Sequence, residues 1–572
     1  MSRTHILTVA LEDYFHGPAF RGLIGEKSWG RFETRYEKSA LSALNSLARS
    51  GSFATFFVGP WLARKCPDVL REIVRQGHEI ALSGDRGPGF RTLAPADFRD
   101  LVRRGRDAVE QSCGHEVLGY RRSDVLLRSR HLAGLQVLAD EGFLYDSSLS
   151  PLAVPFPGEP WRRFVHRHEF GSRSIWEFPL SSQSFAGLLI PFAGGNYFRQ
   201  YPEAAVRWFI RHWDASFEHP LVLYFRLWDL DPAQPRIQTG SRLRDLRHYR
   251  NGDRILRILT DLFEAYRFDS IAGSLQCAQQ PLGESVASMP RVTARIDSAR
   301  PEALSTPVSV IIPCFNEEAT IQYLSRSLEE LRAELEPDYD IQFIFVDDGS
   351  SDTTWQKLTD VFGRRSDCLL LRHDRNRGVA AAVYTGLCNS REVACSMDCD
   401  CSYDPRELKP MLALLTSDVD LVTASPYHPE GRVANVPAWR VALSRGASWL
   451  YQCVTGAPIY TFTSCLRVYR RSAAIACEPV NPGFLGVAEL AGRFALSGKT
   501  IVEHPATLEV RLFGFSKMKV VRTIGGHLRL LAGLARSRFS RRPPGPTIAS
   551  DHKEVQDNLT IATEIKTPGL NS

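Results

Sequence analysis

The sequence lacks any uncharged apolar stretch near the ~20 residues that a membrane-spanning helix requires. Its first residues reach Glu12 and Asp13 before an export signal could develop, no internal repeat is evident, and none of the 12 cysteines forms a CxxC pair. These absences favour a cytoplasmic chain with reduced thiols. Peripheral contact at an inner membrane is the one membrane association that we expect.

Strong charge is also lacking. A formal net charge of +6 over 572 residues is too dilute to indicate a nucleic-acid partner. The composition, 44% hydrophobic and 23% charged, is that of a folded globular protein. Because a single hydrophobic core stops growing near roughly 250–300 residues, the length predicts at least two domains.

The pattern of an apolar strand followed by a helix starts twice, at residues 6–10 and again at residues 307–313. The segment between the two halves is rich in Pro, Ser and Ala and has no periodicity, as expected for a linker. The last residues are polar and punctuated by proline. We therefore predict an N-terminal domain at 1–280, a linker at 281–306, a second domain at 307–530 and a basic, then disordered tail at 531–572.

The second domain opens with two apolar strands that each end in polar residues. Residues 307–313 lead into Asn316 and Glu317, and residues 341–346 end in Asp347 and Asp348. The carboxyl edge of a parallel sheet is where open α/β folds bind ligands, so these side chains are candidates for binding a nucleotide base or ribose. The alternative is a turn rich in Asp that caps the helix starting near residue 353.

Two further segments continue this series. Residues 375–382 start a helix whose N-terminal amides suit a diphosphate, and residues 393–397 lead into Asp398-Cys399-Asp400. Two carboxylates separated by one residue at a strand end can share a hard cation, and Mg²⁺ or Mn²⁺ held by carboxylates and substrate phosphates is the expected chemistry. Such a pair is common by chance, but here it is the fourth element of an ordered series.

Further blocks accompany the series at residues 443–447, 463–470 and 511–517. Together they resemble the GT-A fold of family 2 glycosyltransferases, most closely the dolichyl- or polyprenyl-phosphate mannose synthase branch. The chain departs from that branch at Pro426, where an arginine is usual, and at Ser402, where a glutamine is usual. The resemblance implies an inverting, metal-dependent transfer of a sugar from a nucleoside diphosphate to a polyprenyl phosphate or a glycan.

The resemblance also implies roles for individual residues. The metal ligands are Asp398 and Asp400. Glu489 is either an acceptor-side base or an exposed helix residue. The catalytic candidates are Asp400, Glu489 and Arg467; the donor-binding candidates are Pro313, Asn316, Glu317, Asp347, Asp348, Asn376, Gly378 and Asp398; and the candidates for phosphate or acceptor binding are Ser464, Arg511, Ser516 and Lys517.

The N-terminal half resembles the polysaccharide deacetylases, which are distorted (β/α) barrels. The resemblance runs through residues 11–16, 54–57, 77–80, 119–121, 145–148, 191–195 and 224–225. By this resemblance the catalytic base falls on Ala10, two histidine ligands fall on Ser83 and Gly87, a later histidine falls on Arg226, and only Asp13 remains of the metal set.

One carboxylate does not hold a catalytic zinc ion, which usually has three protein ligands. His16, His78 and Asp85 are candidate substitute ligands, although a histidine near a strand end is more often structural. Two alternatives to the transferase function follow: a carbohydrate deacetylase acting through a rebuilt metal site, and a non-catalytic protein that binds glycans or supports an assembly.

Residues 517–542 combine apolar residues at helical spacing with several arginines and lysines. This pattern is typical of a basic amphipathic helix at a membrane surface. Packing of the same apolar stripe against the second domain is the alternative, and it is the one that we favour.

Overall fold

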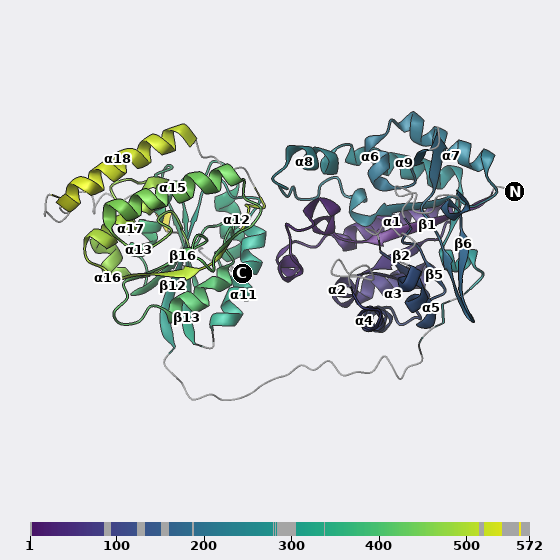
Figure 1. The fold of residues 1–572 in the computed structure, drawn as a ribbon, viewed down its shortest axis with the longest axis horizontal. Helices are drawn as coiled ribbons and strands as arrows, with labels where there is room; N and C mark the ends of the chain where they lie inside the picture. The colour runs from purple at the N-terminus through teal and green to yellow at the C-terminus, as the bar shows by residue number, and fades with distance from the viewer. Residues whose placement is uncertain are drawn as a thin grey trace, which may run out of the picture. The chain divides into compact units, whose positions relative to one another are not determined.

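A computed structural model describes the chain over most of its length (Figure 1). Contacts divide it into unit 1, comprising Met1–Arg21, Thr34–Pro235 and Arg242–Ile296, and unit 2, comprising Gly22–Glu33, Arg236–Ser241 and Asp297–Ser572. Most of the predicted linker lies outside the described residues, so its boundaries stay a prediction. The described residues are 3–84, 93–122, 132–149, 160–185, 188–277, 279–280, 282, 305–336, 338–513, 520–539 and 560–561.

A nine-stranded sheet forms the centre of unit 1, in the order β10-β1-β2-β3-β4-β5-β7-β6 with β11 beside β1. Among the described pairings only β6 runs antiparallel to its neighbour. This confirms the predicted α/β class and the deacetylase-type barrel. The strands are β1 (Thr4–Leu11), β2 (Thr55–Val58), β3 (Glu79–Ser83), β4 (Gly119–Arg121), β5 (Tyr145–Asp146), β6 (His166–Phe170), β7 (Arg173–Glu177), β10 (Val222–Arg226) and β11 (Arg267–Asp269).

Helices cover the sheet of unit 1 because its parallel strands are apolar on both faces; every residue of β1 after Thr4 is buried. A separate hairpin pairs β8 (Ser182–Phe185) with β9 (Leu188–Pro191). The helices are α1 (Tyr36–Ser50), α2 (Pro60–Lys65), α3 (Pro67–Arg75), α4 (Pro95–Cys113), α5 (Leu132–Asp140), α6 (Gly195–Gln200), α7 (Glu203–Ser216), α8 (Arg242–Tyr249), α9 (Gly252–Ala265) and α10 (Ile271–Ser274).

Unit 2 contains an eight-stranded sheet in the order β19-β16-β18-β15-β12-β13-β14-β21. The strands are parallel except β18 and β21, which run antiparallel to their neighbours. This confirms the predicted GT-A-like sheet. The strands are β12 (Thr306–Cys314), β13 (Tyr339–Asp347), β14 (Cys368–Arg372), β15 (Val393–Ser396), β16 (Leu421–Ser425), β18 (Arg467–Arg470), β19 (Ile501–Pro505) and β21 (Thr560–Ile561), and a separate pair joins β17 (Arg432–Val433) to β20 (Thr507–Leu508).

The strand order reverses at β12, which pairs with β13 on one side and β15 on the other. In open α/β sheets this switch point, at the carboxyl ends of the strands, is where ligands bind. The three strand ends predicted from sequence therefore meet at one edge. The helices of unit 2 are α11 (Ile321–Leu335), α12 (Thr354–Phe362), α13 (Val379–Cys388), α14 (Leu408–Ala413), α15 (Ala438–Thr455), α16 (Arg471–Ala476), α17 (Phe484–Leu496) and α18 (Val520–Phe539).

The amphipathic helix predicted near the C-terminus is α18, which packs against α15 and α17 (Figure 1). Leu531 and Leu534 are buried in this contact, whereas Ile524 and Leu528 are 43% and 57% exposed. The apolar stripe therefore serves packing in part and stays exposed in part. No helix among the described residues is long and apolar enough to span a bilayer.

The tail differs in part from its predicted disorder. Thr560 and Ile561 form β21, which pairs with Arg372 and Leu371 of β14 at the edge of the sheet. An exposed edge strand offers unpaired backbone groups, which explains how a short apolar piece of an otherwise polar tail can add to the sheet.

Glycine weakens α18 at a position where nothing requires it. A Cβ atom added at Gly525 would meet no heavy atom within 4 Å. We expect Gly525→Ala to raise the free energy of unfolding by about 1 kcal/mol, the usual difference between the two residues inside a helix. Chemical denaturation measures this. At the control position, Gly526, an added Cβ would lie 2.4 Å from Leu485 Cδ1, so Gly526→Ala should gain less; equal gains would contradict the helix argument.

Candidate functional site

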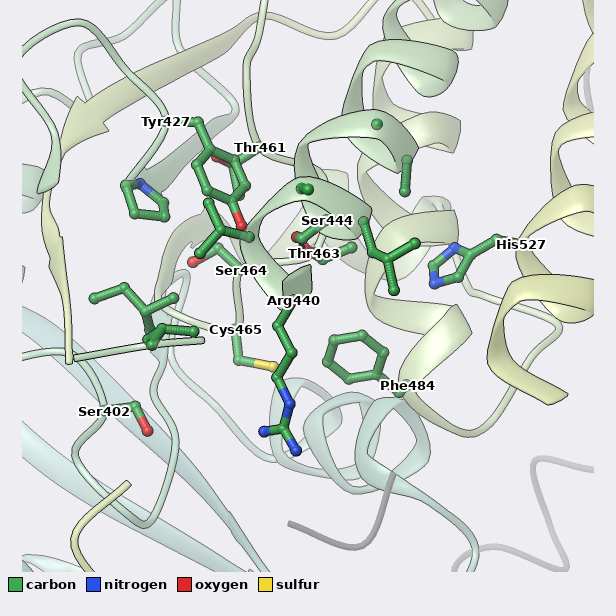
Figure 2. A pocket seen from close by; sticks show the side chains of 18 of the residues that line it. Ser402, Tyr427, Arg440, Ser444, Thr461, Thr463, Ser464, Cys465, Phe484 and His527 are labelled. Carbon is green, nitrogen blue, oxygen red and sulfur yellow. Dashed lines mark hydrogen bonds between the residues drawn. The ribbon is translucent and has the colours of Figure 1, made fainter. Parts of the chain in front are cut away.

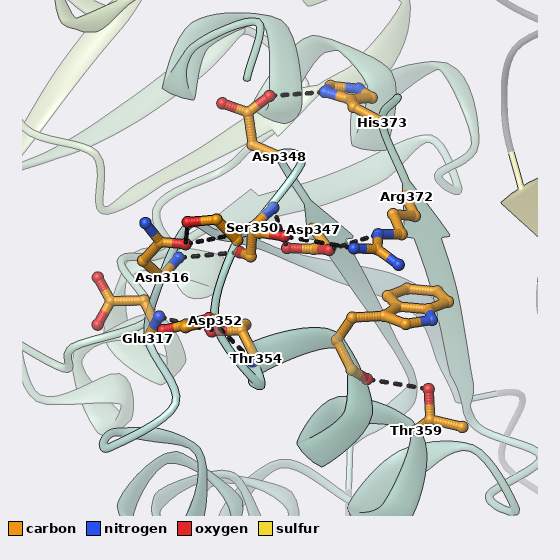
Figure 3. Close-up of polar contacts among 12 residues, drawn as sticks. Asn316, Glu317, Asp347, Asp348, Ser350, Asp352, Thr354, Thr359, Arg372 and His373 are labelled. Carbon is orange, nitrogen blue, oxygen red and sulfur yellow. Dashed lines mark hydrogen bonds and ion pairs between the residues drawn. The ribbon is translucent and has the colours of Figure 1, made fainter. Parts of the chain in front are cut away.

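The ends of β12 and β13 are joined by hydrogen bonds between the loops that follow them (Figure 3). The Asn316 N–H donates to Ser350 Oγ at 2.9 Å, and the Ser351 N–H donates to Asn316 Oδ1 at 2.8 Å. Asn316 adopts a φ of 52°, in the left-handed region that asparagine tolerates. Asn316 therefore fixes the shape of the strand edge.

The two neighbouring carboxylates at the end of β13 have different environments (Figure 3). Asp347 is fully buried, with its Oδ2 3.0 Å from Arg372 Nε. Asp348 accepts hydrogen bonds from the N–H groups of Arg377 and Gly378 at 2.8 and 2.7 Å, and its Oδ1 lies 2.7 Å from His373 Nδ1. Asp348 thus holds the loop that begins α13, which differs from the direct donor contact predicted for it.

The loop before α13 needs glycine. Gly378 has a φ of 106°, and an added Cβ would lie 2.5 Å from the carbonyl oxygen of Pro482. Asn376 is exposed beside it, and Pro313 lies within β12 opposite Val346. The structure thus brings the residues that were predicted to bind the donor to one edge of the sheet. Gly378 is needed there because only glycine fits this backbone conformation.

Asp398 and Asp400 follow β15 at the same edge. Asp400 Oδ1 accepts hydrogen bonds from the Ser402 N–H at 2.9 Å and from the Ser402 hydroxyl at 2.6 Å. The Cys465 thiol is hydrogen-bonded to Asp398, and burial together with the charge of Asp400 raises the pKa of Asp398 to about 7. Ser402 and Cys465 therefore orient the carboxylate pair.

Arg511 links Glu317 to this carboxylate pair. Its guanidinium is hydrogen-bonded to both carboxylate oxygens of Glu317, and its Nη1 lies 3.6 Å from Asp400 Oδ2. Burial raises the pKa of Glu317, although Arg511 opposes that shift. Arg511, predicted to bind phosphate or acceptor, therefore lies beside the donor-side carboxylates.

The carboxylate pair suits a hard divalent cation. Among the described residues, no cluster of three or more His, Cys, Asp or Glu side chains could hold a metal ion. Mg²⁺ and Mn²⁺ need no such cluster, because one or two carboxylates plus substrate phosphates suffice. Burial and, after it, the charge of Asp400 raise the pKa of Asp398, and a cation between the two carboxylates would relieve the repulsion between them.

A cavity of about 550 Å³ opens from Asp398 and Asp400 and runs between α15 and α18 (Figure 2). Its walls are mostly apolar. Arg440 is the one Arg or Lys among the described residues that line it. Residues 443–447 of α15 belong to the blocks that carry the family resemblance, but no site residue was predicted in this helix. The apolar residues from these two helices are Trp439, Val441, Ala442, Leu443, Ala447, Leu450, Ile524, Leu528 and Leu531.

The spacing of apolar residues along α15 is a sequence signal for this cavity. Trp439, Leu443 and Leu450 recur at helical spacing in α15, and each is at least 36% exposed. An amphipathic helix with an apolar face that its own domain leaves uncovered indicates a ligand or a partner. The signal becomes specific only when α18 is placed opposite, which sequence reasoning could not do.

Arg467 and Glu489 lie elsewhere than predicted. Arg467 is fully buried and donates from Nη1 to the Val487 carbonyl at 2.8 Å and from Nη2 to the Phe462 carbonyl at 2.7 Å. Its guanidinium therefore holds backbone, which corrects its predicted catalytic role. Ser464 is buried and lines the cavity. Ser516 and Lys517 lie outside the described residues.

Glu489 does not line the cavity that holds the carboxylate pair. Its carboxylate accepts hydrogen bonds from the N–H groups of Val480 and Asn481, from the Asn481 side chain, and from Arg493 Nε at 2.9 Å. These four donors occupy both oxygens of the carboxylate and hold it against the backbone. The structure therefore favours neither the predicted base nor the exposed alternative, because Glu489 is 3% exposed.

Replacing Glu489 should therefore affect stability rather than chemistry. We expect Glu489→Ala to lower the free energy of unfolding by about 3–5 kcal/mol, because Arg493 loses its buried partner. Glu489→Gln should cost less and leave the rate of sugar transfer per folded molecule within about twofold. Denaturation and kinetics measure the two effects, and a Gln variant that folds normally but does not react would restore the catalytic role.

Unit 1 shows how the deacetylase positions have changed. Ala10 pairs with Arg226 across β1 and β10. The Arg226 guanidinium lies 5.7 Å from the centre of the Trp228 ring and 3.7 Å from Glu12 Oε2. The resemblance places a histidine at position 226, which is a permanently charged arginine here. It places the catalytic base at position 10, which is an alanine here.

Asp13 is also engaged in structure. Its carboxylate accepts hydrogen bonds from the N–H groups of Tyr14 at 2.9 Å and Arg35 at 2.7 Å, and burial raises its pKa to about 6. Ser83 ends β3, half-buried, and Gly87 lies outside the described residues, as does Asp85. His16 Nδ1 accepts from the Asp13 N–H at 3.0 Å, which gives this histidine a structural role.

Two buried histidines of unit 1 predict a pH dependence of stability. Burial lowers the pKa of His78 to about 4, and burial with Arg199 and Arg226 lowers that of His248 to about 3. In the unfolded chain both titrate near about 6.5. Stability is therefore complete above that pH and falls below it, because only the unfolded chain then binds the protons.

Between pH 6.5 and 5.5 we expect the two histidines together to lower the free energy of unfolding by about 2 kcal/mol, a fall that the raised pKa values of Asp13 and Asp398 offset in part. Denaturant titrations of wild-type and variant proteins at several pH values measure these contributions. His248→Gln should remove about half of the histidine contribution, whereas His212→Gln, on α7, is the control. An unchanged slope in His248→Gln would contradict the assignment.

Unit 2 thus presents paired carboxylates at a switch-point edge beside a mostly apolar cavity, in a GT-A-like domain. Matches to family models agree: residues 309–477 match glycosyl transferase family 2, residues 28–124 match polysaccharide deacetylase, and residues 147–276 match DUF3473, a domain of unknown function. The chain therefore carries a glycosyl transferase family 2 domain and, N-terminal to it, a polysaccharide deacetylase domain.

Curated relatives of the transferase domain include a polyprenol monophosphomannose synthase of Mycolicibacterium smegmatis, 29% identical over 36% of this chain and 80% of the relative. Another is a dolichol-phosphate mannosyltransferase of Pyrococcus furiosus, 28% identical over 39% of this chain and 62% of the relative. The chain thus spans less than two thirds of the second protein.

Among solved structures, glucosyl-3-phosphoglycerate synthase of Mycobacterium tuberculosis, in complex with Mn²⁺, uridine diphosphate and glucosyl-3-phosphoglycerate, is 19% identical with a TM-score of 0.31, over 41% of this chain and 80% of that one. A Mycobacterium smegmatis protein provisionally assigned as a polysaccharide deacetylase is 21% identical with a TM-score of 0.30, over 48% of this chain and 89% of that one.

Proposed function

We propose that this chain transfers a hexose from a nucleoside diphosphate to the phosphate of a polyprenyl carrier, with inversion at the anomeric carbon. The observation that carries the proposal is the cavity in which Asp398 and Asp400 open onto an apolar space between α15 and α18. A sugar hydroxyl or a free metabolite would not need such walls, whereas an isoprenoid chain would.

The donor side would bind through the strand edge. Asp398 and Asp400 would hold Mg²⁺ or Mn²⁺, which neutralises charge on the departing nucleoside diphosphate when bound. Asp347 lies at the end of β13, next to the turn tied to Asn316. Arg511 lies beside Asp400, so its guanidinium could release Glu317 and bind a phosphate of the donor instead.

The acceptor side would bind through α15. Arg440 supplies a permanent positive charge in a cavity whose walls are mostly apolar, and Ser444 lies one turn further on the same helix and also lines it. A phosphate headgroup would pair with Arg440 while its chain follows the apolar wall. Since a phosphate acceptor is already ionised, it needs no strong base, which agrees with the engagement of Glu489 elsewhere.

A two-way screen tests the proposal. Purified full-length protein is incubated with a panel of nucleotide sugars and Mg²⁺ or Mn²⁺, with either a polyprenyl phosphate or the matching polyprenol. We expect a glycolipid product only with the phosphate and only with metal. Transfer to a soluble glycan but to no polyprenyl phosphate would overturn the acceptor assignment.

We further propose that unit 1 does not hydrolyse acetyl groups. Two observations support this proposal. Ala10 lies in register with Arg226, so neither position offers a base or a metal ligand, and the carboxylate of Asp13 is hydrogen-bonded to backbone N–H groups. Acetate release from an N-acetylated oligosaccharide, abolished by a chelator, would overturn it.

A further inference from the structure

Unit 2 has a second cavity, of about 390 Å³, between α17 and α18. It is separate from the cavity beside Asp398 and Asp400, which we call the acceptor cavity after its proposed role. The helix α18 turns a different face to each cavity: Ile524, Leu528 and Leu531 line the acceptor cavity, whereas Gly526 and Arg529 line the second. The second cavity has no place in the proposed transfer reaction.

The charges around the second cavity do not balance. Arg493 and Arg529 line it, and Glu489 is its one acid among the described lining residues. Glu489 is already satisfied by its four donors, of which Arg493 uses only Nε. Within the described part of the chain, no hydrogen bond or ion pair uses the Nη atoms of Arg493 or the guanidinium of Arg529, so these groups are available to an anion.

The lining of α18 leaves room for such a ligand. Gly533 lines the cavity, and an added Cβ there would meet no heavy atom within 4 Å. Arg493 approaches from α17, so the two arginines come from different helices. Guanidinium groups pair with phosphate oxygens in a bidentate manner, and two of them facing one space are suited to a phosphate group.

We propose that the cavity between α17 and α18 binds a phosphate-bearing ligand, either a small phosphorylated molecule or the headgroup of an anionic lipid. The bound phosphate joins Arg493 to Arg529 and so ties α18 to α17. Since the opposite face of α18 lines the acceptor cavity, occupancy of the phosphate site fixes one wall of that cavity. This last consequence rests on the proposed function, but the phosphate site itself does not.

The test measures binding to the full-length protein without donor and with metal chelated, so that the carboxylate pair cannot contribute. Inorganic phosphate and pyrophosphate are titrated by calorimetry, and vesicles of phosphatidylcholine with and without phosphatidic acid are compared by sedimentation. Arg529→Gln removes the exposed arginine, and Arg536→Gln, on the same helix but outside the cavity lining, is the matched control for net charge.

We expect saturable binding that weakens about tenfold or more in Arg529→Gln and less than twofold in Arg536→Gln. If Arg529→Gln weakens the binding of soluble phosphate or pyrophosphate, the ligand is a small phosphorylated molecule. If it weakens only the binding of vesicles that contain phosphatidic acid, the ligand is a lipid headgroup. Gly533→Met, which fills the cavity without changing charge, should also abolish binding. Equal binding by wild-type protein and both cavity variants, or no binding to any probe, overturns the site.

The consequence for the acceptor cavity has its own readout. Saturating phosphate should change KM for the polyprenyl phosphate in the wild-type protein and not in Arg529→Gln. If KM does not change, the phosphate site stands but its effect on the acceptor cavity is disproved. If the protein binds phosphate but transfers no sugar, only the proposed function is contradicted.

Discussion

Replacing Asp400 with asparagine is expected to lower the rate of sugar transfer by about a thousandfold, a loss of about 4 kcal/mol of transition-state stabilisation. The carboxylate lies at the switch-point edge with Asp398, oriented by Ser402. Asparagine keeps the shape and the hydrogen bond from the Ser402 N–H but removes the charge that a divalent cation requires. Initial rates at saturating donor, with titrated Mn²⁺, measure the effect.

The same substitution should leave the fold intact. Asp400 is half-buried and its charge is opposed by Asp398, so removing it relieves repulsion and should not lower the free energy of unfolding. Asp418→Asn, an exposed carboxylate hydrogen-bonded to Thr416, is the matched control and should transfer sugar at the wild-type rate. Full activity of Asp400→Asn, or activity that persists after chelation, would disprove a metal site here.

The donor edge could be predicted because its signals are local in sequence. An apolar run that ends close to Asp347 or Asp398 predicts a buried strand, and it also predicts that the carboxylate lies at the carboxyl end of that strand. The parallel order of the sheet then brings the strand ends together. Nothing beyond strand periodicity and the switch-point rule is needed for this part of the site.

The roles of buried polar residues could not be predicted in the same way. Asp348, Arg467 and Glu489 all bond to backbone groups of segments that precede or follow them by several to many residues. A motif gives residue type and spacing but not which backbone amides or carbonyls surround the side chain. The acceptor cavity was missed for a related reason, because its walls come from α15 and α18, which are distant in sequence.

Replacing Arg440 with glutamine should weaken the acceptor and leave the donor unaffected. Arg440 is the one lining arginine or lysine among the described residues of the acceptor cavity. Loss of a hydrogen-bonded charge from a phosphate costs about 1.5–3 kcal/mol, which corresponds to roughly a 10- to 150-fold rise in KM for the polyprenyl phosphate. KM for the nucleotide sugar should stay within about twofold, since the donor binds at the strand edge.

Arg445 provides the control on the same helix. Its guanidinium lies 5.2 Å from the centre of the Tyr427 ring, and it is not among the residues that line the cavity. Arg445→Gln changes net charge equally, so a general loss of attraction to an anionic lipid would affect both variants alike. A large effect confined to Arg440→Gln would identify a specific phosphate contact, whereas equal effects would reduce Arg440 to a contributor of surface charge and remove the acceptor assignment from α15.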